Sequence, residues 1–328
     1  MERVKISNEA TYWPVAPIDV VLTAPLVARF LLGATLPGRL LQAAALGAYL
    51  GNALQDWRAR QGIRKIDFRR EFGADKRQLT PMPREAREAE VALLTNRLND
   101  EFTPARIPRR ELAAEVDRHL TRYIAGITGQ RVETSAEVRS FALAQLLFPF
   151  ALGACDLLSG DVTIFRDVGV FEPHVIAHEF SHRKGYWKEL DAQALAYLSL
   201  SASGEPVLVQ SALCERLHRN VWALAGDNVA TFRALVDGLG LRPELSAQFL
   251  ALRPAPTSDP ISRRVEAAMR RLYDERMRLT GQNGLSDYDV GFTNFLYTFE
   301  VSPVARQAPP AAGTLRPRRR PALKAESA

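Results

Sequence analysis

A chain of 328 residues is long enough for one large domain with appended segments, and its 47% content of hydrophobic residues is ordinary for a protein with a buried core. Its two cysteines, Cys155 and Cys214, are far apart and form no Cys-x-x-Cys pattern, so a disulfide framework is disfavoured and a cysteine-rich zinc site is excluded. The net charge of +6 is concentrated between Arg58 and Arg77 and in the tail around Arg316–Arg320. Such runs are typical of solvated faces and flexible arms, and no nucleic-acid-binding motif accompanies them, so we expect no nucleic-acid partner.

Residues 14–54 are the most apolar part of the chain. They divide at Pro37-Gly38 into two halves, each about 20 residues long, which is the length of a membrane span. Asp19 and Arg29 interrupt the first half and Arg39 the second, so the alternative is a pair of helices buried on the core. We predict an N-terminal hydrophobic helical hairpin within residues 1–56 that associates with a membrane, followed by a basic linker at 57–80.

Two exposed helices are predicted between residues 81 and 125, because each has one apolar stripe among charged residues. The stripes consist of Val91, Leu94 and Leu98 in the first helix and of Leu112, Val116, Leu120 and Ile124 in the second. His119 lies among charges in the second helix, and we interpret it as a solvated side chain.

The next segments predict a small β element followed by helices. Residues 136–151 are strongly apolar, and the β-branched residues of 160–171 predict a short strand or hairpin. A helix is expected to begin at Glu172-Pro173, because proline suits the first helical turn. Further helices are predicted at 207–250 and 259–280. The fold class is therefore mainly α, with the main domain at 81–302 and a disordered, basic, proline-rich tail at 303–328.

The sequence His178-Glu179-Phe180-Ser181-His182 has the form HExxH, which is the part of the chain most indicative of chemistry. Two histidines four residues apart lie on one face of a helix, so both imidazoles can bind one Zn²⁺ ion. Glu179 then lies beside the metal, where it can take a proton from water and pass it to a leaving amine. We expect a zinc-dependent metallohydrolase, most simply a peptidase, with Glu179 as the general base.

A catalytic zinc ion normally has three protein ligands and one open position, so a third ligand must follow the motif. On a straight helix Glu189 would be about 10 Å farther along the axis than His182, which is too far to bind the same ion. Gly185 can end the helix in the left-handed conformation and let Glu189 fold back. We favour Glu189 as the third ligand, with Asp191 as the alternative, and assign His174 a supporting or structural role.

Other residues are expected to support the metal site. Metal-bound histidines need a partner for the second ring nitrogen, and Gln193 or Asp191 could provide it. A donor to the developing oxyanion is also expected, and the sequence does not choose among His218, Tyr288 and Tyr186.

The segment from His178 to Gln193 resembles the corresponding segment of gluzincin-type peptidases, which include the CAAX prenyl protease. The resemblance implies that Glu189 binds zinc and that Gln193 stands where those families have a supporting Asn or Asp. The segment AHEFSHRKGYWKELDAQALAYL, 177–198, also resembles a bacterial family of membrane-anchored HExxH proteins, with Arg183 in place of the usual glutamine. Phe148-Pro149-Phe150 and GQNGLSDYD, 281–289, are weaker similarities to it.

These resemblances imply a zincin-like metallopeptidase domain that acts on a peptide or protein substrate. They also imply a location at the bacterial inner membrane and not a soluble cytoplasmic one. The rival interpretation is a non-catalytic, membrane-associated binding or scaffold protein with a structural metal site. Such a site would have four protein ligands and no open position.

Overall fold

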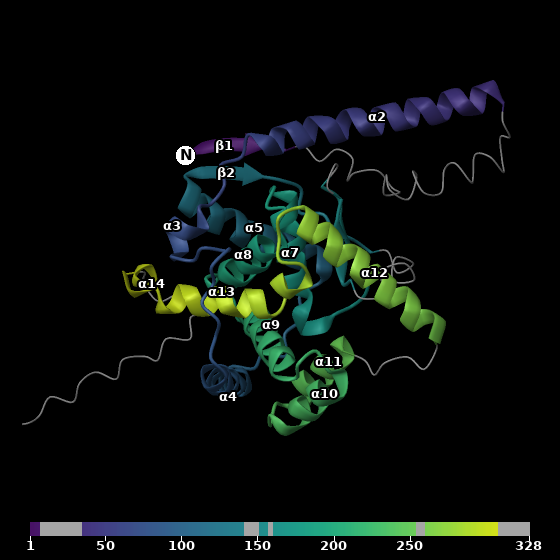
Figure 1. The fold of residues 1–328 in the computed structure, drawn as a ribbon. Coiled ribbons are helices and arrows are strands. Elements are labelled where there is room, and N and C mark those ends of the chain that lie inside the picture. Colours follow the sequence, from purple (N-terminus) through teal and green to yellow (C-terminus); the bar gives the residue numbers. More distant parts are fainter. Residues whose placement is uncertain (7–34, 141–150, 157–159, 254–259, 308–328) are drawn as a thin grey trace, which may run out of the picture.

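The computed structural model describes residues 1–6, 35–140, 151–156, 160–253 and 260–307 (Figure 1). In these ranges the chain is mainly helical, as predicted, and the few strands are short. The predicted first half of the hydrophobic hairpin, Phe148-Pro149-Phe150 and most of the C-terminal tail lie outside the described residues.

The second half of the predicted hairpin is part of one long helix, α2 (Leu36–Gln61), which extends beyond the body of the molecule (Figure 1). Before it, β1 (Glu2–Lys5) pairs in parallel with β2 (Gln130–Glu133), with Glu2 opposite Gln130. Among the described residues, no helix combines the length and the hydropathy that crossing a membrane requires. Membrane association through residues 14–54 stays a prediction.

The segment that we expected to be a basic linker, residues 57–80, contributes to the core. It contains the end of α2 and the short helix α3 (Phe68–Phe72), whose first turn is capped by the carboxylate of Asp67. Phe68 and Phe72 are buried, and both rings make edge-to-face contacts with Phe295. The charged residues of this segment therefore alternate with aromatic residues that pack inward.

The two helices predicted at 81–125 are α4 (Arg84–Asp100) and α5 (Arg109–Thr128), and the residues of both apolar stripes are buried. The interpretation of His119 as solvated is wrong, because its exposed fraction is only 5%. α5 itself packs against α7 and α8. Burial lowers the pKa of His119, and the neighbouring Arg118 lowers it further.

A three-stranded sheet precedes the HExxH helix, in agreement with the predicted β element. β5 (Val162–Ile164) lies in its centre, parallel to β3 (Arg139–Ser140) and antiparallel to β4 (Gly153–Cys155). Both β4 and β5 contact α7, so the sheet covers one side of the helix that carries the motif.

Three buried helices form the centre of the molecule: α7 (Glu172–Arg183), α8 (Glu189–Ser201) and α9 (Pro206–Leu224). α7 follows the short 3-10 helix η2 (Gly169–Phe171) and begins at Glu172-Pro173, as predicted. The remaining elements are α10 (Val229–Gly238), α11 (Pro243–Leu252), α12 (Pro260–Leu279), η3 (Leu285–Asp287), α13 (Val290–Val301) and α14 (Pro303–Gln307). α14 corrects the prediction of disorder from residue 303, because Ser302 caps it and Ala305 is buried.

Candidate metal centre

The chain turns sharply after the second histidine of the motif, as the glycine predicted. α7 ends at Arg183, and Gly185 has a φ of 88°, in the left-handed region that favours glycine. The turn is closed by the N–H of Gly185, which donates to the carbonyl of His182 at 2.7 Å. α8 begins at Glu189, so this residue folds back toward α7.

The side chains of His178, His182 and Glu189 converge on one buried point. Oε2 of Glu189 lies 3.1 Å from Nε2 of His178 and 3.2 Å from Nε2 of His182, and the two ring nitrogens are 3.2 Å apart. Zinc bound tetrahedrally at about 2.0–2.1 Å separates neighbouring ligand atoms by about 3.3 Å. The triangle therefore has the size that a zinc ion requires, and the group could hold a metal ion.

The hydrogen bond made by Nδ1 of His182 determines whether Nε2, the ring nitrogen that faces Glu189, carries a proton. Nδ1 of His182 lies 2.8 Å from the carbonyl oxygen of Tyr186, which can only accept a hydrogen bond. In the neutral ring the proton is therefore on Nδ1, and Nε2 directs a lone pair at the carboxylate of Glu189. Converging lone pairs repel one another unless a cation lies between them, so the group needs either an added proton or a metal ion.

The pKa values of His182 and Glu189 describe the site without a metal ion, in which a proton provides the positive charge. Burial alone would lower the pKa of His182, but the carboxylate of Glu189 raises it to about 9. Burial alone would raise the pKa of Glu189, but the two imidazoles hold it well below its ordinary value. At neutral pH the metal-free site thus contains a buried imidazolium beside a carboxylate.

Glu179 is buried between α7 and the sheet. A Cβ atom added at Gly153 in β4 would lie 3.3 Å from Cγ of Glu179, so the strand passes close to this side chain. Burial raises the pKa of Glu179, although the nearby His178 and His182 lower it. Its carboxylate is therefore more basic than an exposed glutamate and closer to the value that suits a general base.

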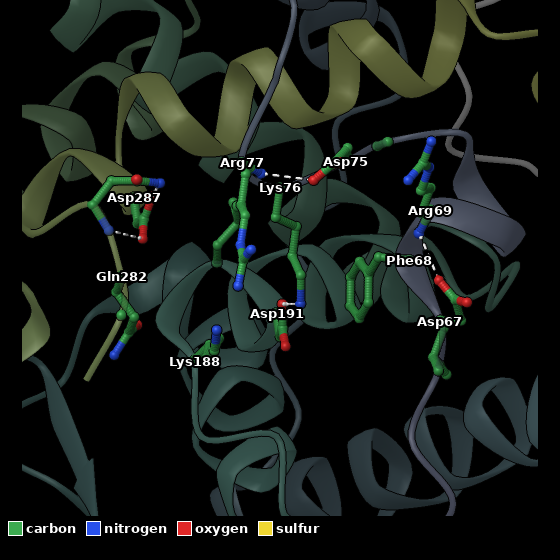
Figure 2. Close-up of a pocket in the computed structure, with 15 residues that line it drawn as sticks. Asp67, Phe68, Arg69, Asp75, Lys76, Arg77, Lys188, Asp191, Gln282 and Asp287 are labelled. Atoms are coloured by element: carbon green, nitrogen blue, oxygen red, sulfur yellow. Dashed lines mark hydrogen bonds and ion pairs between the residues drawn. The ribbon is translucent and has the colours of Figure 1, made fainter.

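Asp191, the alternative third ligand, lines a cavity together with Lys76 (Figure 2). Its Oδ1 accepts a hydrogen bond from Nζ of Lys76 at 2.6 Å, in a cavity of about 300 Å³. Arg77 and Lys188 also extend into this cavity, and Gln282 lies at its edge (Figure 2). Among the described residues, the group with metal-ligand geometry contains Glu189 and not Asp191.

The structure corrects the prediction that Gln193 or Asp191 supports the ring nitrogens of the motif. Nε2 of Gln193 donates to Oε1 of Glu215 at 2.6 Å, and His174 lies 4.0 Å from the same oxygen. The partner of His182 is instead the backbone carbonyl of Tyr186. A carbonyl four residues after His182 becomes available because the turn at Gly185 brings it back over the ring.

Two tyrosines, Tyr273 and Tyr288, also border the group formed by His178, His182 and Glu189. The ring of Tyr288 stacks on His178, with centroids 5.7 Å apart, and its hydroxyl lies 3.3 Å from that of Tyr273. The Tyr273 hydroxyl donates to Oε1 of Glu189 at 2.7 Å. Sequence reasoning included Tyr288 among three oxyanion candidates but missed Tyr273, because nothing in the spacing of α12 indicates a contact 84 residues away.

The other two oxyanion candidates have different surroundings. The His218 ring packs among the aromatic rings of Phe171, Phe232 and Phe249. The hydroxyl of Tyr186 accepts a hydrogen bond from the N–H of Ile66 at 3.3 Å, so it faces the segment after α2.

Comparisons of the chain with family models, with curated proteins and with solved structures found no match.

Proposed function

We propose that the protein is a zinc-dependent metallohydrolase, most simply a peptidase, in which His178, His182 and Glu189 bind zinc and Glu179 is the general base. The observation that carries this proposal is the convergence of three acceptor atoms, mutually 3.1–3.2 Å apart, on one buried point. Two imidazoles and a carboxylate are the donor set of many catalytic zinc sites.

A zinc ion held by these side chains would supply Lewis acidity, which activates water and polarises a substrate carbonyl at neutral pH. Glu179 follows His178 directly and would accept a proton from the attacking water. Its raised pKa favours holding that proton until it passes to the leaving amine. The hydroxyl of Tyr288, whose ring stacks on His178, is our candidate donor to the oxyanion that develops in the transition state.

The substrate class rests on the resemblance of the segment from His178 to Gln193 to gluzincin-type peptidases, which act on peptide bonds. The resemblance of residues 177–198 to a bacterial family of membrane-anchored HExxH proteins supports the proposal that residues 14–54 associate with a membrane and that the substrate lies near it. The rival function, a binding or scaffold protein, requires a closed structural site with four protein ligands. Among the described residues, the metal-ligand group contains three, which favours the catalytic alternative.

The proposal is tested by zinc content and by one conservative substitution. We expect the purified protein to bind one equivalent of zinc and Glu179→Gln to bind the same amount. Hydrolysis of a peptide library by this variant is expected to fall by at least about 100-fold, because a proton acceptor of the same shape is lost. His182→Gln is the matched control, which should lose both zinc and activity. Full activity of Glu179→Gln would remove this residue from the mechanism.

A further inference from the structure

The end of α12 and the turn after it form a closed hairpin, residues 273–288, which we call the C-terminal hairpin. Oδ1 of Asp274 accepts a hydrogen bond from the N–H of Leu285 at 2.8 Å, which joins its two sides. The N–H of Gln282 donates to the carbonyl of the buried Met277 at 3.1 Å. The backbone of the hairpin is therefore held by its own hydrogen bonds.

This hairpin holds Glu189 at two points. The Tyr273 hydroxyl donates to Oε1 of the carboxylate at 2.7 Å, and Oε1 of Gln282 accepts the backbone N–H of Glu189 at 2.8 Å. Gln282 lines the same cavity as Lys188, the residue before α8 (Figure 2). One short segment thus fixes both the main chain and the side chain of the residue that we assign as the third ligand.

The two oxygens of this carboxylate have different partners. Oε2 is the atom that lies 3.1 and 3.2 Å from the ring nitrogens of His178 and His182, whereas Oε1 faces the Tyr273 hydroxyl. The Tyr288 hydroxyl also hydrogen-bonds to Glu189, and the Tyr273 hydroxyl is the donor that lies 2.7 Å from Oε1. The Tyr273 hydroxyl therefore restrains the carboxylate against a rotation that would bring Oε1 as well as Oε2 to a cation, and it increases the preorganisation of the site.

We propose that Tyr273 is a positioning residue for the metal: it holds Oε1 of Glu189 so that Oε2 alone faces the ion, while Gln282 fixes the first turn of α8. The inference rests on the proposed zinc binding by His178, His182 and Glu189. Partners of metal ligands typically account for about 10-fold to 100-fold in metal affinity. Tyr273 comes from a helix outside the HExxH region, so zinc affinity depends on the C-terminal hairpin.

The test is the zinc affinity of the full-length protein, measured by competition with a chromophoric chelator. Tyr273→Phe removes one hydroxyl and is expected to weaken zinc binding by about 10-fold to 100-fold. Gln282→Ala is a second variant, expected to weaken it in the same direction. Tyr297→Phe, which removes the hydroxyl of a tyrosine in α13, is the matched control and should leave the affinity unchanged.

A purely structural role for Tyr273 makes a different prediction, which the cobalt-substituted protein tests. If Oε1 is released, it can join the cobalt ion, and the higher ligand number weakens the visible absorption. We expect this loss in Tyr273→Phe, together with an unchanged unfolding temperature of the metal-free protein. A lower unfolding temperature with an unchanged cobalt spectrum would overturn the positioning role.

The outcomes separate this inference from the proposed function. Wild-type zinc binding with equal affinity in Tyr273→Phe would refute the role of Tyr273 and leave the metal site standing. A wild-type protein that binds no zinc would overturn both.

Discussion

Arg216 in α9 and Glu189 in α8 are both buried charged residues, but their surroundings differ in kind. The Arg216 guanidinium donates to both carboxylate oxygens of Glu90 and of Glu300, and also to the hydroxyl of Tyr197. Nε of this arginine and Oε1 of Glu90 form the shortest of these contacts. The residues of the cluster around Arg216 thus serve as hydrogen-bond donors and acceptors for one another within the protein.

The group formed by His178, His182 and Glu189 differs from this cluster, because acceptors face one another in it. Two imidazoles and one carboxylate present three acceptor atoms to a single point when both rings are neutral. Burial removes the water that would otherwise solvate them. Burial is common to both clusters, and what differs is the balance between hydrogen-bond donors and acceptors. The predictions below test whether that balance distinguishes a functional cluster from a structural one.

The largest expected effect is on the cluster around Arg216, in which hydrogen-bond donors and acceptors are paired with one another. Arg216→Ala would leave the carboxylates of Glu90 and Glu300 without their buried cation, and we expect it to lower the free energy of unfolding by about 3–5 kcal/mol. Urea denaturation measures this. In the metal-free protein above pH 9, where the His182 ring has lost its added proton, Glu189→Gln should cost at most about 1 kcal/mol, because it removes one of several converging acceptors. Equal losses in both variants would refute the distinction.

An intermediate effect is expected on the pH dependence of stability, through His174. Burial lowers the pKa of His174 to about 4, although Glu215 raises it somewhat. The unfolded chain, with a histidine pKa of about 6.5, therefore binds more protons than the folded protein between about pH 6.5 and pH 4. Stability contributed by neutral His174 is present above pH 6.5 and is lost as the pH falls through this window, by about 3 kcal/mol at most.

The measurement compares wild type with His174→Gln by urea denaturation at pH 7 and pH 4.5, with a chelator present. The variant is expected to lose less stability on acidification than wild type, because it has no ring to protonate. Equal losses would mean that His174 is protonated in the folded state.

A smaller effect is expected at the turn between α7 and α8. Gly185→Ala places a Cβ atom at a φ of 88° and against Nζ of Lys65, which donates to the Gly185 carbonyl at 2.7 Å. We expect a loss of about 1–2 kcal/mol in the free energy of unfolding and a weaker zinc affinity, since the turn orients Glu189. Gly204→Ala is the control: its φ is 76° and no atom lies within 4 Å of the added Cβ. It should lose stability without losing zinc affinity.

Local rules predicted much of the centre of the molecule. The four-residue spacing of His178 and His182, with Gly185 after them, is sufficient to predict a bend that brings Glu189 back to the rings. The apolar stripes of α4 and α5 follow from helical periodicity in the same way. These features depend on neighbours within about two helical turns, and such neighbours are visible in one sequence.

Features that depend on distant partners could not be predicted. Lys76 and Asp191, 115 residues apart, form an ion pair that accounts for the different environment of Asp191. His119 looks solvated from its charged neighbours but is buried in the folded protein. Tyr273 reaches Glu189 only because the C-terminal hairpin returns to the centre. In each case the residue type is compatible with several environments, and tertiary packing determines which of them the side chain has.

The two residues after His182 have a consequence for ion selectivity. The side chains of Arg183 and Lys184 are fully buried, and they donate to the backbone carbonyls of Val132, Ser135, Glu137 and Gly160. These bonds anchor the end of α7 without any ligand. We therefore expect the two imidazoles to keep their spacing, and the site to prefer ions with bonds of about 2.0–2.1 Å over calcium, whose bonds are about 2.3–2.6 Å long.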